Sequence, residues 1–243
     1  IPTYMYVQRN KNIYVNLFDN SSTSLDMNKK SIQIVQQNNY PWDGKLLFTI
    51  TPKSSQEFNL LIRIPGWATN QAVPSDLYAF DEPSAEKVTI TINKKPIDFK
   101  IEKGYAVLSK TWKKGDVVEV SLPMEVRKVV ANSKVQDDIG KVVLQRGPLI
   151  FCAEWPDNGG TATNFILPEN TKFTSEFRKD LLNGVTVLKT NALAVEVDAS
   201  GHKVTTVQKP LMAIPYYAWA HRGKGEMMFW FPEKITNVHL ISR

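Results

Sequence analysis

The amino-acid sequence predicts an all-β protein with two consecutive antiparallel β-sandwich domains and very little helix. The first observation is that apolar and polar residues alternate along many short segments, which is the period of a strand with one buried face. The second is that turn-forming residues separate these segments at short intervals, a spacing typical of sandwiches. The third is the length of 243 residues, which is enough for two domains of ordinary size.

The first domain is expected to occupy residues 1–125. About eight alternating segments lie between residues 13 and 124, and that number of strands completes one sandwich. Turns are predicted at Trp42-Asp43-Gly44 and at Lys113-Lys114-Gly115-Asp116, where turn-forming residues interrupt the alternation. The clearest alternating triplets are Ile13/Val15/Leu17, Leu46/Phe48/Ile50, Leu60/Ile62/Ile64, Val88/Ile90/Ile92 and Val118/Val120/Leu122.

The second domain is expected to occupy residues 126–243. Pro123 cannot donate a backbone hydrogen bond to a sheet, and a new strand pattern begins just after it, so the boundary is placed near residue 125. One candidate helix of about two or three turns covers residues 175–183, with Ser175 as its N-cap and Gly184 as its stop. Strand patterns return over residues 141–154, 185–188, 193–197 and 211–231.

Charge and hydropathy argue against two classes of partner. Thirty Lys and Arg residues against 24 Asp and Glu give a net charge of +6, but the basic residues are scattered, so no nucleic-acid partner is expected. No apolar run reaches the roughly 18–20 residues of a membrane span, so no membrane partner is expected either. A single cysteine excludes an intrachain disulfide and leaves the compartment undecided between periplasm and cytoplasm. Because Ile1 is not an initiator methionine, we expect a processed chain or a piece of a longer protein.

Residues that commonly bind metals or act as nucleophiles are sparse. Cys152 lies in an apolar segment with no basic neighbour to lower the pKa of its thiol, and we interpret it as a small buried hydrophobe. His202, His221 and His239 are not spaced so that two imidazoles of one element could meet a metal ion. No metal site and no cofactor is therefore predicted for this chain.

Paired carboxylates would be needed for glycoside hydrolysis. Glu154, Asp157 and Glu226 could be assigned to such a pair, but sequence spacing does not show whether they meet across a cleft. No serine-hydrolase, zinc-protease, dinucleotide or P-loop motif occurs in the sequence. We therefore predict no catalytic residue in this chain.

Six tryptophans are available for stacking on sugar rings or for filling the cores. Trp42 and Trp67 flank predicted turns, which favours exposure, and they are our candidate carbohydrate-binding residues. Trp112 and Trp230 belong to alternating segments and are expected in the cores.

The densest aromatic segment is Pro215–Trp219, which carries three large rings in five residues. If it continues as a strand, Tyr217 and Trp219 point to one side and Tyr216 to the other. Rings with a polar end suit an interface better than open solvent. We therefore predict that Tyr216, Tyr217 and Trp219 contact another domain or subunit.

Several long segments follow one another in the order found in a known family. They are LLIRIPGWA (60–68), INKKPIDF (92–99), GYAVLSKTWKKGDVVEVSLPMEVR (104–127), GKVVLQRGPLIFCAE (140–154), LLNGVTVL (181–188) and LMAIPYYAWAHRGKGEMMFW (211–230). Together they resemble the C-terminal β region of glycoside hydrolase family 127, the β-L-arabinofuranosidase-like proteins long described as a domain of unknown function. One departure is Asn93-Lys94-Lys95-Pro96, where the family often has Asn-Gly-Lys-Pro, so Lys94 has to tolerate a glycine-like turn conformation.

The resemblance implies an N-terminal (α/α)6 catalytic barrel in front of two β-sandwiches. In the family the barrel supplies a cysteine nucleophile and a zinc ion held by cysteines and a glutamate. None of that barrel is present in this sequence, and Cys152 matches a strand position of the second sandwich. Zinc is thus expected only in the missing barrel.

The resemblance also suggests a role for the chain. It implies a non-catalytic accessory region whose partner is the catalytic barrel of the same polypeptide, with a homodimer as a further option. A stand-alone carbohydrate-binding module, with carbohydrate as its partner, is the alternative function.

Overall fold

The computed structural model describes residues 2–198, 200 and 203–238, and it is nearly all β. The expected fold class is confirmed, with most strands pairing antiparallel. The chain divides into two compact units. Unit 1 comprises the residues up to Thr69 together with Ser84–Met124, and unit 2 comprises Asn70–Pro83 together with the residues from Glu125 onward.

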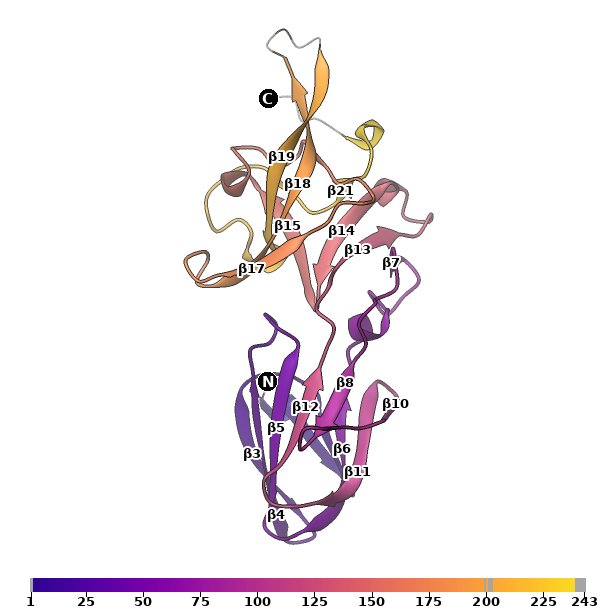
Figure 1. Cartoon of the computed structure of the whole chain (residues 1–243), viewed down its shortest axis with the longest axis vertical. Coiled ribbons are helices and arrows are strands. Elements are labelled where there is room, and N and C mark those ends of the chain that lie inside the picture. The colour runs from indigo at the N-terminus through magenta and orange to yellow at the C-terminus, as the bar shows by residue number, and fades with distance from the viewer. Residues whose placement is uncertain (1, 199, 201–202, 239–243) are drawn as a thin grey trace. The chain divides into compact units, whose positions relative to one another are not determined.

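Unit 1 is a sandwich of two sheets (Figure 1). One pair of neighbours, β2 and β6, runs parallel, and every other pair in the two sheets of the described chain is antiparallel. In spatial order, the five-stranded sheet contains β1 (Tyr6–Arg9), β2 (Asn12–Val15), β6 (Gln56–Arg63), β11 (Tyr105–Trp112) and β10 (Lys100–Glu102). The six-stranded sheet contains β3 (Ser21–Met27), β4 (Lys30–Asn38), β5 (Lys45–Pro52), β12 (Asp116–Ser121), β8 (Thr89–Ile92) and β9 (Lys95–Pro96). Two short helices, α1 (Pro2–Met5) and η1 (Gly66–Thr69), complete the unit.

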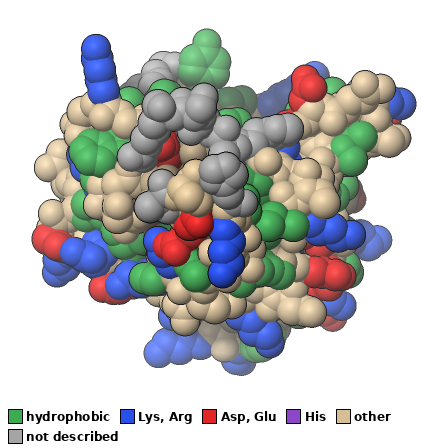
Figure 2. Space-filling view, turned by 90° about the horizontal axis from the view of Figure 1, so that it is seen from above, with side chains coloured by type: hydrophobic (Ala, Val, Ile, Leu, Met, Phe, Trp, Pro, Cys, Tyr) green, Lys and Arg blue, Asp and Glu red, His purple; other side chains and the backbone are tan. Residues whose placement is uncertain are grey.

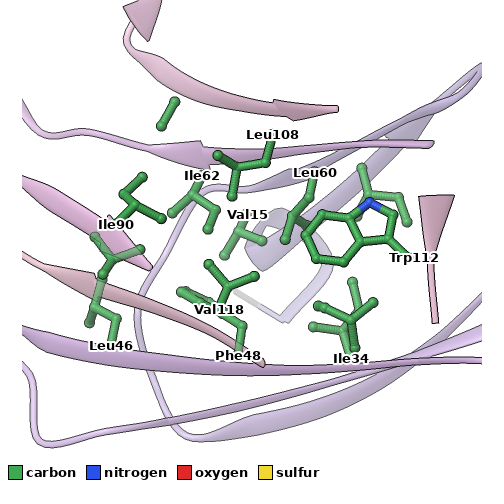
Figure 3. Packing of buried hydrophobic residues seen from close by; sticks show 14 of the residues in the cluster. Val15, Ile34, Leu46, Phe48, Leu60, Ile62, Ile90, Leu108, Trp112 and Val118 are labelled. Atoms are coloured by element: carbon green, nitrogen blue, oxygen red, sulfur yellow. The ribbon is translucent and has the colours of Figure 1, made fainter. Parts of the chain in front are cut away.

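The core of unit 1 lies between these two sheets (Figure 3). Along β5, every second residue from Leu46 to Pro52 is buried, as the sequence alternation predicts. Trp112 is fully buried and its ring stacks on Phe58, with the ring centroids 5.6 Å apart. The indole Nε1 donates a hydrogen bond to the Phe58 carbonyl at 3.0 Å. The expectation that Trp112 fills a core is therefore confirmed.

The strands of unit 2 join into one hydrogen-bonded sheet of ten strands among the described residues. In spatial order it contains β16 (Phe165–Ile166), β18 (Val185–Val197), β19 (Val204–Pro215), β15 (Leu149–Glu154), β14 (Lys141–Arg146), β13 (Val126–Ala131) and β7 (Tyr78–Phe80). β17 (Thr174–Arg178) pairs with β18, β20 (Met227–Met228) with β15, and β21 (Phe231–Pro232) with β14. Four 3₁₀ turns connect the strands: η2 (Gln136–Asp138), η3 (Trp155–Asp157), η4 (Tyr216–Ala218) and η5 (Ile235–Asn237).

One strand of unit 2 comes from the middle of the sequence of unit 1. Residues 70–83 leave the first unit, and β7 pairs with β13, placing Tyr78 opposite Ala131 and Phe80 opposite Val129. The proposed domains, 1–125 and 126–243, do not include this excursion. Its pairing partner lies about 50 residues away in sequence, and local patterns do not reveal such long-range partners.

The predicted helix over residues 175–183 is wrong. Thr174–Arg178 instead forms β17, which pairs with β18 over five residues and is followed by a turn. Leu182, Asn183 and Gly184 all have positive φ in that turn. An isolated helix of this length is only marginally stable, so pairing with a long neighbouring strand overrides the local helix signals.

The unusual turn at Asn93-Lys94 has the expected conformation. Both residues have positive φ, 51° and 64°, and they connect β8 to β9. This is the geometry of a tight hairpin turn in which glycine normally takes the second position. Lys94 therefore adopts the conformation that glycine adopts at lower cost.

Candidate functional site

The aromatic segment after β19 is a 3₁₀ turn, not a continuing strand. A 3₁₀ turn brings residues three apart to the same side. Tyr216 and Trp219 accordingly stack on each other, with centroids 6.2 Å apart and an interplanar angle of 26°. The predicted placement of these two rings on opposite sides is wrong, because the chain turns immediately after Pro215.

The stack continues into a longer aromatic row. Tyr216 contacts Phe229 at a centroid distance of 5.1 Å, and Phe229 contacts Trp230 at 6.2 Å. Trp230 in turn contacts Tyr78 of β7 at 5.7 Å. We call Tyr78, Trp230, Phe229, Tyr216 and Trp219 the aromatic row. Trp230 is half-buried in this row and is absent from the hydrophobic core clusters, so its predicted core position is wrong.

One end of the aromatic row is open to solvent. Tyr216 and Trp219 are 36% and 38% exposed, and their neighbour Tyr217 is 59% exposed. Ala218 is buried and fixes the turn to the body of unit 2. Exposed aromatic rings are typical of contact surfaces. The face of the molecule seen from above in Figure 2 carries apolar side chains interspersed with charges of both signs.

A buried ion cluster fixes the segment that follows Trp219. Arg222 donates from Nη1 and Nη2 to the two carboxylate oxygens of Asp157, at 2.7 and 2.5 Å, and from Nε to Glu154 at 3.0 Å. Glu154 also accepts a hydrogen bond from the Ala220 amide at 2.8 Å. The Glu154 and Asp157 side chains are only 2% and 8% exposed. Hydrogen bonding to Asp157 raises the pKa of Arg222, burial opposes the rise, and Glu154 adds to it.

A second anchor lies four residues further along. One carboxylate oxygen of Glu226 accepts hydrogen bonds from the hydroxyls of Thr161 and Thr163 and from the amides of Ala162 and Thr163. Gly225 packs so closely on the Trp155 indole that an added Cβ would lie 2.0 Å from a ring carbon. These contacts and the Arg222 cluster anchor the segment that connects Trp219 to Phe229, two members of the aromatic row.

The three carboxylates considered for glycoside hydrolysis therefore have structural partners. Glu154 and Asp157 meet, but both bind the same guanidinium. Glu226 is engaged by the separate Thr161–Thr163 loop. The arrangement stabilises a loop, and all three of these carboxyl groups are engaged by partners within unit 2.

Cys152 lies in the interior of β15, between core residues. Its side chain is fully buried, and burial raises the pKa of the thiol to about 12. A thiol with that pKa is protonated at neutral pH and is a poor nucleophile and metal ligand. Among the described residues, no three His, Cys, Asp or Glu side chains lie close enough to hold a metal ion. His221 is exposed, and His202 and His239 lie outside the described residues.

Trp42 lies in the loop before β5, and Trp67 lies in η1. Both are half-buried. Trp67 packs against the core of unit 1 and forms a side-chain hydrogen bond with Tyr40. Their assignment as carbohydrate-binding residues stays a prediction. No helix in the described part of the chain is long and apolar enough to span a membrane.

Sequence reasoning missed three members of the aromatic row and the partners of Arg222. Tyr78, Phe229 and Trp230 are separated from Tyr216 in the sequence and join its row only in the fold. No spacing rule links Arg222 to Glu154, 68 residues away. The one local indication of this cluster is Arg222 itself, a lone arginine in an aromatic segment.

Comparison with protein families identifies the two halves of the chain. Residues 12–124 match the GH127 middle domain of β-L-arabinofuranosidases. Residues 126–232 match the C-terminal domain of glycoside hydrolase family 127. The two matches meet at residue 125, next to the point where unit 1 ends.

Known proteins of the same kind match over most of the chain. A non-reducing end β-L-arabinofuranosidase from Bifidobacterium longum subsp. longum is 32% identical over 212 residues, which cover 81% of this chain and 30% of that protein. A solved GH127 β-arabinofuranosidase structure matches 98% of this chain with a TM-score of 0.92 and 38% identity. A GH127 β-L-arabinofuranosidase from Geobacillus stearothermophilus T6 matches 96% with a TM-score of 0.84 and 36% identity.

The matched proteins are considerably longer than this chain. The chain covers 37% and 35% of the two solved chains, or about a third of their length. The matches fall in the β-rich middle and C-terminal domains and run through both units of the structure. The chain therefore belongs to glycoside hydrolase family 127, of which it comprises the middle and C-terminal domains.

Proposed function

We propose that this chain is a non-catalytic accessory region of a β-L-arabinofuranosidase-like enzyme, and that its second unit supports the enzyme's catalytic domain. The main support for this role is the exposed end of the aromatic row, which the buried Arg222 cluster holds in place. The matched relatives are longer proteins, and this chain corresponds to about a third of their length.

Physical chemistry favours a docking role for this surface. Tyr and Trp are enriched in the cores of protein interfaces, where a few such residues dominate the binding energy. The rings of Tyr216 and Trp219 are already ordered against each other, so docking would cost little additional side-chain entropy. Docking would also remove the apolar faces of Tyr216, Tyr217 and Trp219 from water.

The docking proposal predicts different effects of one double substitution in two contexts. Tyr217→Ala combined with Trp219→Ala should cost the chain alone about 1–2 kcal/mol, because both rings are partly exposed already. In a polypeptide that also carries the family's catalytic domain, it should cost at least about 2 kcal/mol more and reduce hydrolysis of an aryl β-L-arabinofuranoside. Denaturant unfolding and turnover of that substrate measure the two effects.

Phe177→Ala is the matched control, since Phe177 is an aromatic residue of unit 2 that is 44% exposed and does not belong to the aromatic row. It should have similar effects in both contexts. Equal costs of the double substitution in the two contexts would contradict docking on the catalytic domain. A concentration-dependent dimer of the chain alone, abolished by the double substitution, would instead identify a second copy as the occupant.

The alternative function is a stand-alone carbohydrate-binding module. The nearly parallel, partly exposed rings of Tyr216 and Trp219 favour it, because flat aromatic faces stack on sugar rings. This alternative predicts that arabino-oligosaccharides quench tryptophan fluorescence, and that Trp219→Ala removes the quenching without unfolding the chain. Matching substitutions at Trp42 and Trp67 would test the two residues proposed from the sequence.

The accessory role also predicts that the 243-residue chain is inactive by itself. We expect no turnover of an aryl β-L-arabinofuranoside and no tight zinc binding, because the buried Cys152 thiol is protonated at neutral pH. Iodoacetamide at pH 8 should leave Cys152 unmodified in the folded chain and modify it after unfolding. Turnover that disappears in Cys152→Ala would show that an active site lies in unit 2.

A further inference from the structure

A groove lies on the outer face of the six-stranded sheet of unit 1, away from the core. Its volume is about 610 Å³, within the range of about 300–1,000 Å³ typical of small-molecule sites. Strands β4, β5, β12 and β8 form its floor, and Asn39 and Asp43, from the loop between β4 and β5, form a wall. We call it the outer groove; it is lined by Gln37, Asn38, Asn39, Asp43, Lys45, Leu46, Leu47, Thr89, Thr91, Glu119, Val120 and Ser121.

The strand register places four of these side chains in one row. Gln37 pairs with Leu47, Leu47 with Glu119, and Glu119 with Thr91. Paired residues on neighbouring strands project from the same face at close distance. The row therefore crosses four strands and presents an amide, an aliphatic group, a carboxylate and a hydroxyl in that order.

A second row runs beside the first. Lys45 pairs with Ser121, and Ser121 pairs with Thr89. This row adds an ammonium group and two hydroxyls. Leu47 is half-buried, and its aliphatic side chain lies between the polar groups of the two rows.

Several polar groups of the groove lack partners within the protein. Among the described residues, the Gln37 amide and the Glu119 carboxylate make no hydrogen bond or ion pair. On this face the Thr91 hydroxyl is buried and also unpaired. Buried polar atoms are nearly always hydrogen-bonded, and an unpaired one costs about 1–3 kcal/mol. The unpaired Thr91 hydroxyl therefore points to an absent partner.

The wall of the groove is rigid. The amides of Trp42 and Asp43 both donate to the Asn39 carbonyl, at 2.9 and 3.2 Å, and the Leu122 amide donates to the Gly44 carbonyl at 2.9 Å. A Cβ on Gly44 would lie 2.1 Å from the Leu122 carbonyl oxygen, so only glycine fits there. A preformed wall lowers the entropic cost of binding a ligand.

We propose that the outer groove binds a neutral oligosaccharide the size of a disaccharide or trisaccharide. Sugar hydroxyls both donate and accept hydrogen bonds, which matches acceptors on Glu119 and Asp43 and donors on Gln37 and Lys45. The mixed signs of charge do not suit a phosphate or another strong anion. Leu47 contacts the apolar C–H face of a sugar ring. This inference does not depend on the docking proposal, which concerns a surface of unit 2.

Titration calorimetry on the 243-residue chain tests the groove, with arabinotriose as the probe and xylotriose and cellotriose as comparators. We expect at least one of the three to bind with a Kd of about 1 mM or less. Glu119→Gln and Gln37→Ala should each weaken that binding about tenfold, because each removes a hydrogen-bonding group that a sugar hydroxyl would use.

Two matched controls separate the groove from the rest of the surface. Gln33→Ala changes an exposed glutamine on the same strand outside the groove, and Glu57→Gln changes an exposed carboxylate on the other sheet. Both should leave binding unchanged, and thermal unfolding checks that every variant is folded.

Two outcomes would overturn the proposal. One is no binding of any probe at about 10 mM. The other is binding that Glu119→Gln and Gln37→Ala leave intact, and loss of that same binding in Trp219→Ala would assign it to the aromatic row instead. Failure of the groove would not affect the docking test, because that test changes only residues of unit 2.

Discussion

Replacing Trp112 with alanine is expected to lower the free energy of unfolding of unit 1 by about 3–5 kcal/mol, near the upper end of this range. The side chain is fully buried between the two sheets (Figure 3). Its ring stacks on Phe58. Its removal leaves a large cavity and also leaves the Phe58 carbonyl without its hydrogen bond from Nε1. Unfolding in urea, followed by circular dichroism, measures the change.

Two further variants distinguish the parts of this effect. Trp112→Phe keeps much of the ring but loses the indole N–H, so it should be intermediate. Thr111→Ala, at the exposed neighbouring position, should change stability by no more than about 0.5 kcal/mol. If unit 2 unfolds in a separate transition, Trp112→Ala should leave that transition unchanged. A loss below about 1 kcal/mol would show that Trp112 is not essential to the core.

Replacing Arg222 with alanine is the second large effect, with an expected cost of about 3–5 kcal/mol to unit 2. The substitution leaves the Glu154 and Asp157 carboxylates, 2% and 8% exposed, without their cation. Burying unpaired charges is far more costly than losing a surface ion pair. Urea unfolding measures this loss, and tryptophan fluorescence reports changes near the aromatic row.

Arg222→Lys tests whether the planar shape of the guanidinium is needed to bind Glu154 and Asp157. Lysine keeps the charge but cannot donate from two sides of a planar group, so an intermediate cost is expected. Lys134→Ala removes an exposed ion pair with Asp76 and should have little effect. Equal effects of Arg222→Ala and Lys134→Ala would mean that the buried cluster does not stabilise unit 2.

The Arg222 result also bears on function. The cluster fixes the Ala220 amide, directly after Trp219, so its loss should disorder the exposed end of the aromatic row. In a polypeptide with the catalytic domain, Arg222→Ala should therefore weaken docking as the double substitution at Tyr217 and Trp219 does. This effect and the loss of stability share one cause.

Local sequence patterns are sufficient to predict the fold class and the family of this chain. Alternation with a period of two depends only on which residues are apolar, and it is reproduced in β5, where every second residue is buried. The turn at Asn93-Lys94 and the buried position of Trp112 can likewise be predicted from the local sequence pattern. Long ordered segments indicated the family, and the matches over residues 12–124 and 126–232 confirmed it.

The way in which distant segments combine depends on long-range contacts that local patterns do not predict. β17 became a strand because β18 was available to pair with it, although its sequence favours a helix. The aromatic row exists because a 3₁₀ turn, an excursion through Tyr78 and the loop after Arg222 meet in unit 2. The outer groove depends on the register of four strands. These features rest on contacts between residues far apart in sequence, and such contacts are set by the packing of the whole unit and not by the period of any one segment.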